Sequence, residues 1–280
     1  MTLSLTAPEF DLFRDLIEKE CGISVHNDKM YLIETRLMKL VLENGCENFG
    51  EFYHKAKHDN PLKDKIVDAM TTNETLWFRD NTPYIALKEY LFPMMVEQMK
   101  SGQRSELNIW SAACSTGQEP YSIAMLAHEY ARQTGNKELI SGRMNIFATD
   151  ISPSALMIAK IGRYDPLSMS RGMTEELRGR YFEEQNKVAV IKPEIKNMVK
   201  FQQMNLLKPF ENIGRYDVVL LRNVAIYFSE EFKINLFKRI TQVMKPNGYL
   251  FLGASETLFA YSQDFKNVEF ANARFYQLNI

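Results

Sequence analysis

The 280-residue chain is predicted to be an α/β protein with a parallel sheet and a small all-helical N-terminal region. From residue 107 onward, predicted strands and helices alternate, which is the pattern of a parallel sheet covered by helices. Residues 1–70 show helical periodicity only. Residues 107–125 predict a strand, a loop of small residues and a helix. This is the arrangement with which open α/β sheets bind nucleotide-like ligands.

The composition is that of an ordinary globular protein, with 45% hydrophobic and 25% charged residues. A net charge of -1 gives no support to a nucleic-acid binder, which usually carries a basic excess. No apolar run approaches the roughly 20 residues of a membrane span, and the first residues do not resemble a signal peptide. The three cysteines have neither disulfide nor metal spacing, so we expect no metal and a cytoplasmic location.

The N-terminal region begins with a helix at about residues 7–21, whose apolar face includes Phe10 and Phe13. Further helices are expected at 28–43, 49–57 and 63–70. The region has 9 Lys/Arg and 13 Asp/Glu, a net charge of 9 − 13 = −4, so any basic surface there is local. Arg36 and Lys39 flank the apolar stripe of the second helix. They form either a solvated helix edge or such a local surface.

Residues 71–79 interrupt the helical pattern with hydroxyl and amide side chains, which favour caps and turns. Leu76, Trp77 and Phe78 should pack this linker onto the next domain. A long helix is expected at 83–100. We therefore expect three parts: a helical domain at 1–70, a linker with a long helix at 71–100, and an α/β domain at 101–280.

Within the α/β domain, the remaining elements follow from apolar runs and turn residues. Strands are expected at 144–148, 199–204, 217–221, 249–253 and 274–278, helices at 153–161 and 228–244, and a turn at 245–248. The segment between Gly162 and Lys200 is too long for a simple crossover. We expect an inserted subdomain at about 163–200, with a helix at 174–182 and a hairpin that turns at 192–194.

The loop after the first strand contains neither a G-x-G-x-x-G motif nor a P-loop. Glu119 stands at the start of the following helix, where it would repel a pyrophosphate. A carboxylate there suits a ligand with an adenosine end and a positive charge, and S-adenosylmethionine is such a ligand. The alternative is that Glu119 only stabilises the N-terminus of its helix.

Polar residues follow the other predicted strands at the same edge of the sheet. Asp150 ends the second strand, where an acid can bind ribose hydroxyls, although it could instead cap the next helix. Asn205 ends the third strand and could border an adenine. Arg222 and Asn223 follow the fourth, buried strand and point toward the same crevice, unless they only cap the loop.

Five motifs in this order and spacing resemble the chemotaxis receptor methyltransferases, the CheR family, over nearly the whole chain. They are Thr71-Thr72-Asn73-x-Thr75-x-x-Phe78-Arg79, Trp110-Ser-Ala-Ala-Cys-Ser-Thr-Gly-Gln-Glu119-Pro-Tyr-Ser, Ala148-Thr-Asp150-Ile, Asn205-Leu206 and Arg222-Asn223-Val-x-Ile-Tyr227-Phe.

The resemblance implies a Rossmann-like S-adenosylmethionine-dependent methyltransferase domain with an inserted antiparallel subdomain. It implies an O-methyltransferase that esterifies specific glutamates on the cytoplasmic helices of chemoreceptors and releases S-adenosylhomocysteine. The implied cofactor-binding residues are Asn73, Thr75, Arg79, Glu119, Asp150, Asn205, Leu206, Arg222 and Asn223. Tyr227 matches a tyrosine near the transferred methyl. Whether the inserted subdomain holds a receptor C-terminal peptide stays open.

The chemistry of this reaction agrees with the residues present. A glutamate with a pKa near 4.3 is already ionised at neutral pH, so no general base is needed. A catalytically silent adaptor of the same fold is the main alternative, and the intact cofactor motifs and Tyr227 argue against it. A methyltransferase for nucleic acid or a small acid is a third possibility, against which the acidic N-terminal domain argues. We expect Arg36 and Lys39 to extend freely toward a receptor helix.

Overall fold

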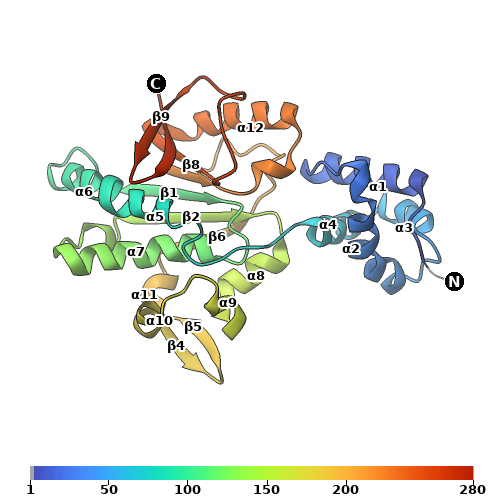
Figure 1. Ribbon diagram of the computed structural model, residues 1–280, viewed down its shortest axis with the longest axis horizontal. Coiled ribbons are helices and arrows are strands. Elements are labelled where there is room, and N and C mark those ends of the chain that lie inside the picture. Colours follow the sequence, from blue (N-terminus) through green and yellow to red (C-terminus); the bar gives the residue numbers. More distant parts are fainter. Residues whose placement is uncertain (1–2, 280) are drawn as a thin grey trace.

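The N-terminal helices form a bundle around their own apolar core (Figure 1). The computed structural model describes residues 3–279 of the chain. The first elements are α1 (Ala7–Cys21), a 3₁₀ turn (Asn27–Lys29), α2 (Met30–Glu43), α3 (Phe49–Ala56) and α4 (Asn60–Met70). In the centre, the rings of Phe13 and Phe52 stack with their centroids 6.0 Å apart, and Phe49 packs edge-on against Phe13. The bundle therefore buries its apolar helix faces within itself.

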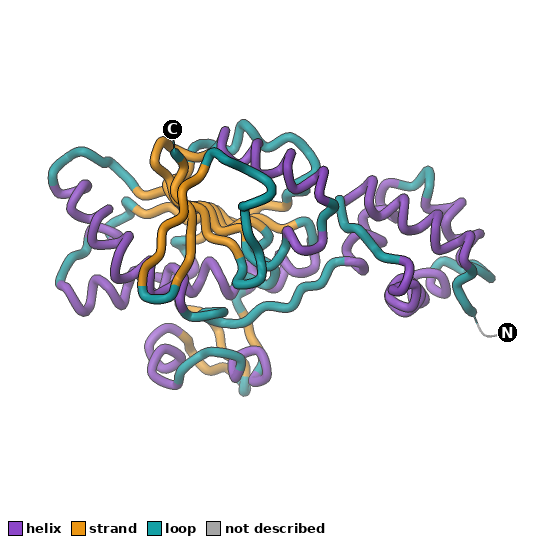
Figure 2. Tube along the Cα trace, turned by 45° about the horizontal axis from the view of Figure 1, so that its top comes forward, coloured by secondary structure: helices purple, strands orange, loops and turns teal. Residues whose placement is uncertain are grey.

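The linker runs from this bundle to the rest of the chain without regular structure (Figure 2). Trp77 fixes it in place: its indole N–H donates to the carbonyl of Ser168, and its ring packs on Tyr164 and Phe182. The predicted long helix is not uniform. It consists of α5 (Thr82–Ala86), a π-helical turn (Leu87–Leu91) and α6 (Phe92–Lys100). Pro93 has no N–H to donate to the turn before it, which explains the irregularity.

A seven-stranded mixed sheet forms the centre of the larger part, in the order β6-β2-β1-β7-β8-β10-β9. Its strands are β1 (Leu107–Ala112), β2 (Met144–Asp150), β6 (Val199–Gln203), β7 (Tyr216–Leu221), β8 (Met244–Leu252), β9 (Phe265–Phe270) and β10 (Ala273–Leu278). The first five are parallel to one another. β10 runs antiparallel to both of its neighbours, β8 and β9. The chain order reverses between β1 and β7, so the crevice for a ligand is expected at their carboxyl ends.

Helices cover both faces of this sheet and create two apolar layers. Residues of α6 and α7 (Gln118–Thr134), together with Leu156 of α8 (Pro153–Ile161), pack on one face. Residues of α12 (Glu230–Gln242) pack on the other face, where Leu236 and Phe237 meet Val219 of β7. Because β7 is covered on both sides, all six of its residues are buried, as its continuous apolar run predicts.

The inserted subdomain is confirmed, but its hairpin differs from our prediction. Its elements are β3 (Arg163–Tyr164), α9 (Pro166–Ser170), α10 (Glu175–Tyr181), β4 (Phe182–Gln185), β5 (Val188–Ile191) and α11 (Pro193–Lys196), with the antiparallel order β3-β5-β4. The hairpin joins β4 to β5 and turns at Asn186 and Lys187, which both have positive φ. The prediction of a turn at 192–194 was wrong, because Pro193 begins a helix there.

The C-terminal segment adds one strand that the sequence did not predict. β9 is half-exposed and lies at the edge of the sheet, where it pairs only with β10. The apolar residues Phe265, Val268 and Phe270 do not alternate regularly with polar ones, so the sequence pattern did not indicate a strand. β8 also begins earlier than predicted, and its register with β7 shifts between Tyr216 and Val218. The segment 245–248, which we expected to form a turn before the strand, is instead the irregular first part of β8.

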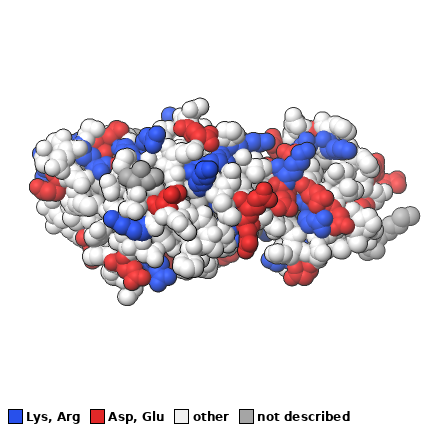
Figure 3. Space-filling model, turned by 90° about the horizontal axis from the view of Figure 1, so that it is seen from above, with Lys and Arg blue, Asp and Glu red and all other residues white. Residues whose placement is uncertain are grey.

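The surface has mixed charge. Figure 3 shows acidic and basic side chains interspersed across one face of both parts of the molecule, in keeping with the net charge of -1. This face therefore has no single-sign field of the kind that attracts a polyanion. Within residues 3–279, no helix is long and apolar enough to cross a membrane.

Candidate functional site

One pocket lies at the carboxyl ends of β1, β2, β6 and β7, where the strand order reverses. Its volume, including the open mouth, is about 930 Å³. All ten residues expected from the motifs line it: Asn73, Thr75, Arg79, Glu119, Asp150, Asn205, Leu206, Arg222, Asn223 and Tyr227. Residues far apart in the sequence thus meet around one space.

The loop after β1 reaches the pocket through an unusual backbone. Ala113 and Ser115 have φ values of 64° and 51°, a conformation that is uncommon for residues with side chains. Two hydrogen bonds hold this geometry. The N–H of Cys114 donates to the carbonyl of Thr149 at 2.9 Å, and the N–H of Ser115 donates to Asp150 at 2.7 Å. Local strain of this kind is concentrated at functional sites, and here it turns the loop toward the cavity.

Asp150 connects the loops that follow β1 and β2. Its two carboxylate oxygens accept from the N–H groups of Ser115 and Ser152, at 2.7 and 2.9 Å. Burial raises the pKa of Asp150, and these hydrogen bonds act in the opposite direction. The cap of α8 is the hydroxyl of Ser152, which accepts from Ala155. The carboxylate of Asp150 is therefore free of the capping role that the sequence left open.

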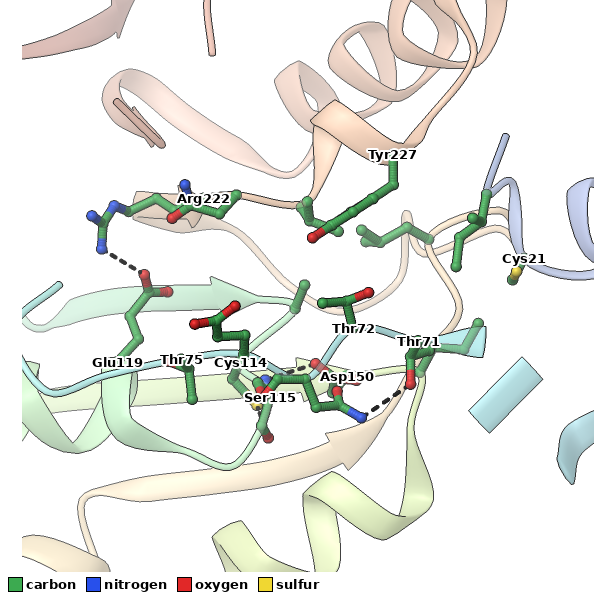
Figure 4. Close-up of a pocket in the computed structure, with 18 of the residues that line it drawn as sticks. Cys21, Thr71, Thr72, Thr75, Cys114, Ser115, Glu119, Asp150, Arg222 and Tyr227 are labelled. Atoms are coloured by element: carbon green, nitrogen blue, oxygen red, sulfur yellow. Dashed lines mark hydrogen bonds and ion pairs between the residues drawn. The ribbon is translucent and has the colours of Figure 1, made fainter. Parts of the chain in front are cut away.

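Glu119 and Arg222 point toward each other at one end of the pocket (Figure 4). The Arg222 guanidinium donates to Glu119 at 3.1 Å, and the Ser111 hydroxyl donates to the other oxygen of Glu119 at 2.8 Å. Burial raises the pKa of Glu119, while the positive charge of Arg222 lowers it; the net shift is upward. Each carboxylate oxygen keeps acceptor capacity for one more donor.

The same arginine also fixes the linker. Arg222 donates to the side chain of Asp80 at 2.8 Å and to the carbonyl of Arg79 at 2.7 Å. Its side chain is only 2% exposed, and the buried charge is paired with two carboxylates, Glu119 and Asp80. The sequence did not identify Asp80, because an acid after Arg79 has no periodic or motif signal of its own.

The helical bundle contributes part of the pocket wall, which sequence reasoning also missed. Cys21 and Ile23 line the cavity. Ile23 forms a β-bridge with Phe228, and the N–H of Ser24 donates to the carbonyl of Tyr227 at 2.8 Å. Gly22, the C-cap of α1, has φ 76°, and a Cβ there would lie 2.8 Å from the ring of Phe232. Only glycine allows this close approach to α12.

Two expected residues use their side chains for structure. The amide of Asn205 donates to the carbonyl of Glu20 at 2.7 Å and accepts from Leu207 at 2.9 Å. The amide of Asn73 donates to Thr71 at 3.0 Å. Both side chains therefore contribute to the pocket indirectly, because they fix the neighbouring segments that form its wall. By contrast, the ring of Tyr227 extends into the cavity (Figure 4).

Arg36 does not extend freely from the bundle, so that expectation was wrong. Its guanidinium donates to the carbonyls of Met70 and Thr71, at 2.5 and 3.2 Å, and to the hydroxyl of Thr72. The end of α4 leaves these carbonyls without helical partners, and a nearby cation satisfies them. The side chain of Lys39 is 84% exposed, and its Nζ lies 3.6 Å from the carboxylate of Glu43; its expected contact with a receptor stays a prediction.

These groups fit S-adenosylmethionine. The cavity has a buried carboxylate at the end of β2, suited to ribose hydroxyls. A second carboxylate, Glu119, stands at the start of α7 beside Arg222, so that an ammonium and a carboxylate of one ligand can each find a partner of opposite charge.

Comparison with known sequences decides the family. The model of the SAM-binding domain of CheR methyltransferases matches residues 73–274, and that of the CheR all-alpha domain matches residues 8–71. The chain belongs to the CheR methyltransferase family. Its cofactor is S-adenosylmethionine.

Relatives of similar length support this assignment. The chain is 45% identical to chemotaxis protein methyltransferase 1 of Pseudomonas aeruginosa, over 91% of this chain and 92% of that protein. It is 41% identical to chemotaxis protein methyltransferase Cher2 of Pseudomonas putida, over 96% and 97% of the two chains. Among solved structures, the N-methyltransferase NodS of Bradyrhizobium japonicum aligns at 12% identity with a TM-score of 0.38, covering 72% of this chain and 91% of NodS.

Proposed function

We propose that this protein methylates the side-chain carboxylates of specific glutamates on chemotaxis receptors, forming glutamate methyl esters from S-adenosylmethionine. One observation carries the proposal: ten residues from five separated motifs surround a single pocket at the topological switch point. The names of the relatives, chemotaxis protein methyltransferases, supply the substrate class. Sensory adaptation is the corresponding role, in the cytoplasm.

The residues divide into three groups by chemistry. We assign Glu119, Arg222 and Asp150 to the charged and hydroxyl groups of the cofactor, and Asn73, Thr75, Arg79, Asn205, Leu206 and Asn223 to the surrounding walls. Tyr227 is assigned to the reacting end, because its ring extends into the cavity. We further propose a helical domain at 1–70, a linker at 71–100 and a catalytic domain at 101–280.

When bound, S-adenosylmethionine supplies an activated methyl group on a positively charged sulfur. The glutamate acceptor is ionised at neutral pH, so the protein does not need to remove a proton. The task of the pocket is to exclude water and to hold the acceptor oxygen in line with the methyl group. The walls from the helical bundle, including Ile23, support water exclusion, because they cover the side of the cavity next to Tyr227.

The deciding experiment uses the full chain, methyl-labelled cofactor and membranes that contain chemoreceptors. Label should appear on the receptor and should be released by mild base as methanol, which is the behaviour of a carboxylate methyl ester. Receptors whose methyl-accepting glutamates are replaced by alanine serve as the control. Base-stable label, or label on the control receptors, would disprove glutamate methylation.

A further inference from the structure

The loop from Arg222 to Tyr227 carries four of the residues that line the pocket, yet one carboxylate outside the pocket holds its backbone. We propose that Glu256 is a positioning residue for methyl transfer, which fixes this loop and thereby places Asn223 and Tyr227. The inference rests on the proposed function for the identity of the reaction. The measurement of cofactor-product affinity that tests it does not depend on which group accepts the methyl.

The carboxylate of Glu256 accepts four backbone N–H groups. One oxygen accepts from Asn223 and Gly253, both at 2.7 Å. The other accepts from Val224 at 3.1 Å and from Ile226 at 3.2 Å. Hydrogen bonds to an ionised acceptor are stronger than those between neutral groups. A single side chain thus joins the turn after β8 to the loop after β7.

The loop needs such an acceptor because its backbone cannot satisfy itself. Asn223 has φ 57°, in the left-handed region, and the residues after it form only one 3₁₀ turn, Ala225–Tyr227. The first N–H groups of so short a turn have no partner inside it. Glu256 supplies the acceptor for those of Asn223, Val224 and Ile226. Without it, this backbone would be held mainly by the bridge from Ile23 to Phe228 and the bond from Ser24 to Tyr227.

Glu256 stands behind the loop rather than in the cofactor pocket. It lines a neighbouring cleft whose walls also include Asp80 and Glu269. It can therefore influence the cofactor only through the loop. Gly253 provides a second, independent observation: a Cβ at this position would lie 2.5 Å from the side-chain nitrogen of Asn223 and 2.8 Å from the carboxylate of Glu256. The close approach of both side chains to the backbone of residue 253 requires glycine here.

The test compares Glu256→Gln with the wild type as full-length protein. Glutamine keeps the shape, but it directs an NH₂ group at two of the four N–H donors. We expect at least a tenfold loss of affinity for S-adenosylhomocysteine by calorimetry. The kcat for receptor methylation should fall by tenfold or more with little change in the KM for receptor. Hydrogen exchange should accelerate in peptides covering 222–228 and stay unchanged in β1 and β2.

Two further variants sharpen the result. Glu269→Gln is the matched control, because Glu269 lines the same cleft but, within residues 3–279, forms an ion pair only with exposed Arg274, at 3.2 Å. This variant should behave as wild type. Gly253→Ala should reproduce the effects of Glu256→Gln. Wild-type affinity and kcat in Glu256→Gln would overturn the inference. Faster exchange throughout the protein would also overturn it, because Glu256 would then serve general stability. If the wild type binds S-adenosylhomocysteine but methylates no receptor, the proposed function fails and the Glu256 inference does not.

Discussion

The guanidinium of Arg222 lies 3.1 Å from the carboxylate of Glu119, so these oppositely charged residues of the cofactor pocket are bonded to each other. From the sequence alone, Glu119 was expected either to favour a ligand with a positive charge or only to stabilise the N-terminus of its helix. The structure instead shows a buried ion pair, which is completed by Ser111 on one side and Asp80 on the other. The ammonium of a zwitterionic ligand can bind Glu119 while its carboxylate binds Arg222, so that neither buried charge is left without a partner.

The first prediction concerns the charge of Glu119. Glu119→Gln keeps the shape but removes the charge, and it should weaken S-adenosylhomocysteine binding by about 1.5–3 kcal/mol, the range for hydrogen bonds to charged groups. Calorimetry at pH 7 measures this loss. Glu138→Gln is the control, because Glu138 pairs with Arg143 at 2.6 Å outside the pocket. If Glu119→Gln and Glu138→Gln bound S-adenosylhomocysteine equally well, Glu119 would not be a cofactor-binding residue.

The second prediction concerns pH. The pKa of Glu119 is raised by burial, against the opposing charge of Arg222, and the ionised form is the one that attracts an ammonium. The affinity of the wild type should therefore fall on acidification, starting above the pH at which an ordinary glutamate titrates. The fall should be shallower in Glu119→Gln, where only Asp150 still titrates with a raised pKa. Parallel curves for the two proteins would contradict this assignment.

The third prediction concerns Asp150. Asp150→Ala should weaken cofactor binding by roughly 1–3 kcal/mol, the cost of leaving buried polar groups without a partner. Part of this loss is expected from the N–H of Ser115, which loses its acceptor. Asp165→Ala is a matched control, because Asp165 also accepts a backbone N–H, from Ser168 at 2.7 Å, but outside the pocket. Unchanged binding in Asp150→Ala would exclude it as a ligand.

The fourth prediction separates Lys39 from Arg36. Lys39 is exposed, so Lys39→Glu should slow receptor methylation at low salt and leave cofactor affinity intact, because exposed charges mainly set association rates. Arg36→Glu should lower cofactor affinity as well, since Arg36 binds the backbone of Met70 and Thr71 at the start of the pocket wall. Receptor methylation assays and calorimetry on both variants distinguish the two roles. Normal methylation by Lys39→Glu at low salt would place the receptor elsewhere.

The fifth prediction concerns the attachment of the inserted subdomain. Glu129 on α7 accepts from Arg180 at 2.5 Å and from the hydroxyl of Tyr181 at 2.6 Å, both on α10. Burial raises its pKa, but the hydrogen bonds from Arg132, Tyr181 and Arg180 outweigh this and lower the pKa to about 2. A lowered pKa adds stability above the unfolded-state pKa, and this contribution is lost as the pH falls toward 2.

Glu129→Gln should therefore reduce the free energy of unfolding by about 1–2 kcal/mol at pH 7, after allowance for solvent screening. The difference from wild type should shrink between pH 4.5 and pH 2. Urea unfolding at several pH values measures it. A difference that does not depend on pH would mean that packing, and not the ionised carboxylate, holds α10.

The sequence grouped the residues of the pocket better than it predicted the elements around them. Residues at the carboxyl ends of parallel strands must meet, so Asp150, Asn205 and Arg222 could be grouped from the order of the predicted strands alone. Side-chain contacts between segments that are distant in the sequence produce no such pattern. The engagement of Arg36 with the linker depends on where α4 ends against α2. The four bonds of Glu256 depend on how two loops meet, and local sequence around Glu256 does not indicate them.

The bridge from Ile23 to Phe228 has a consequence for how such enzymes can diversify. The bundle expected to recognise receptors also closes the cofactor cavity, through Ile23 and the contact of Glu20 with Asn205. Recombination that joined this catalytic part to a foreign bundle would alter the cavity wall as well as receptor choice. New receptor specificity in this lineage is therefore reached more readily by substitutions on the outer faces of the bundle than by exchange of the whole bundle.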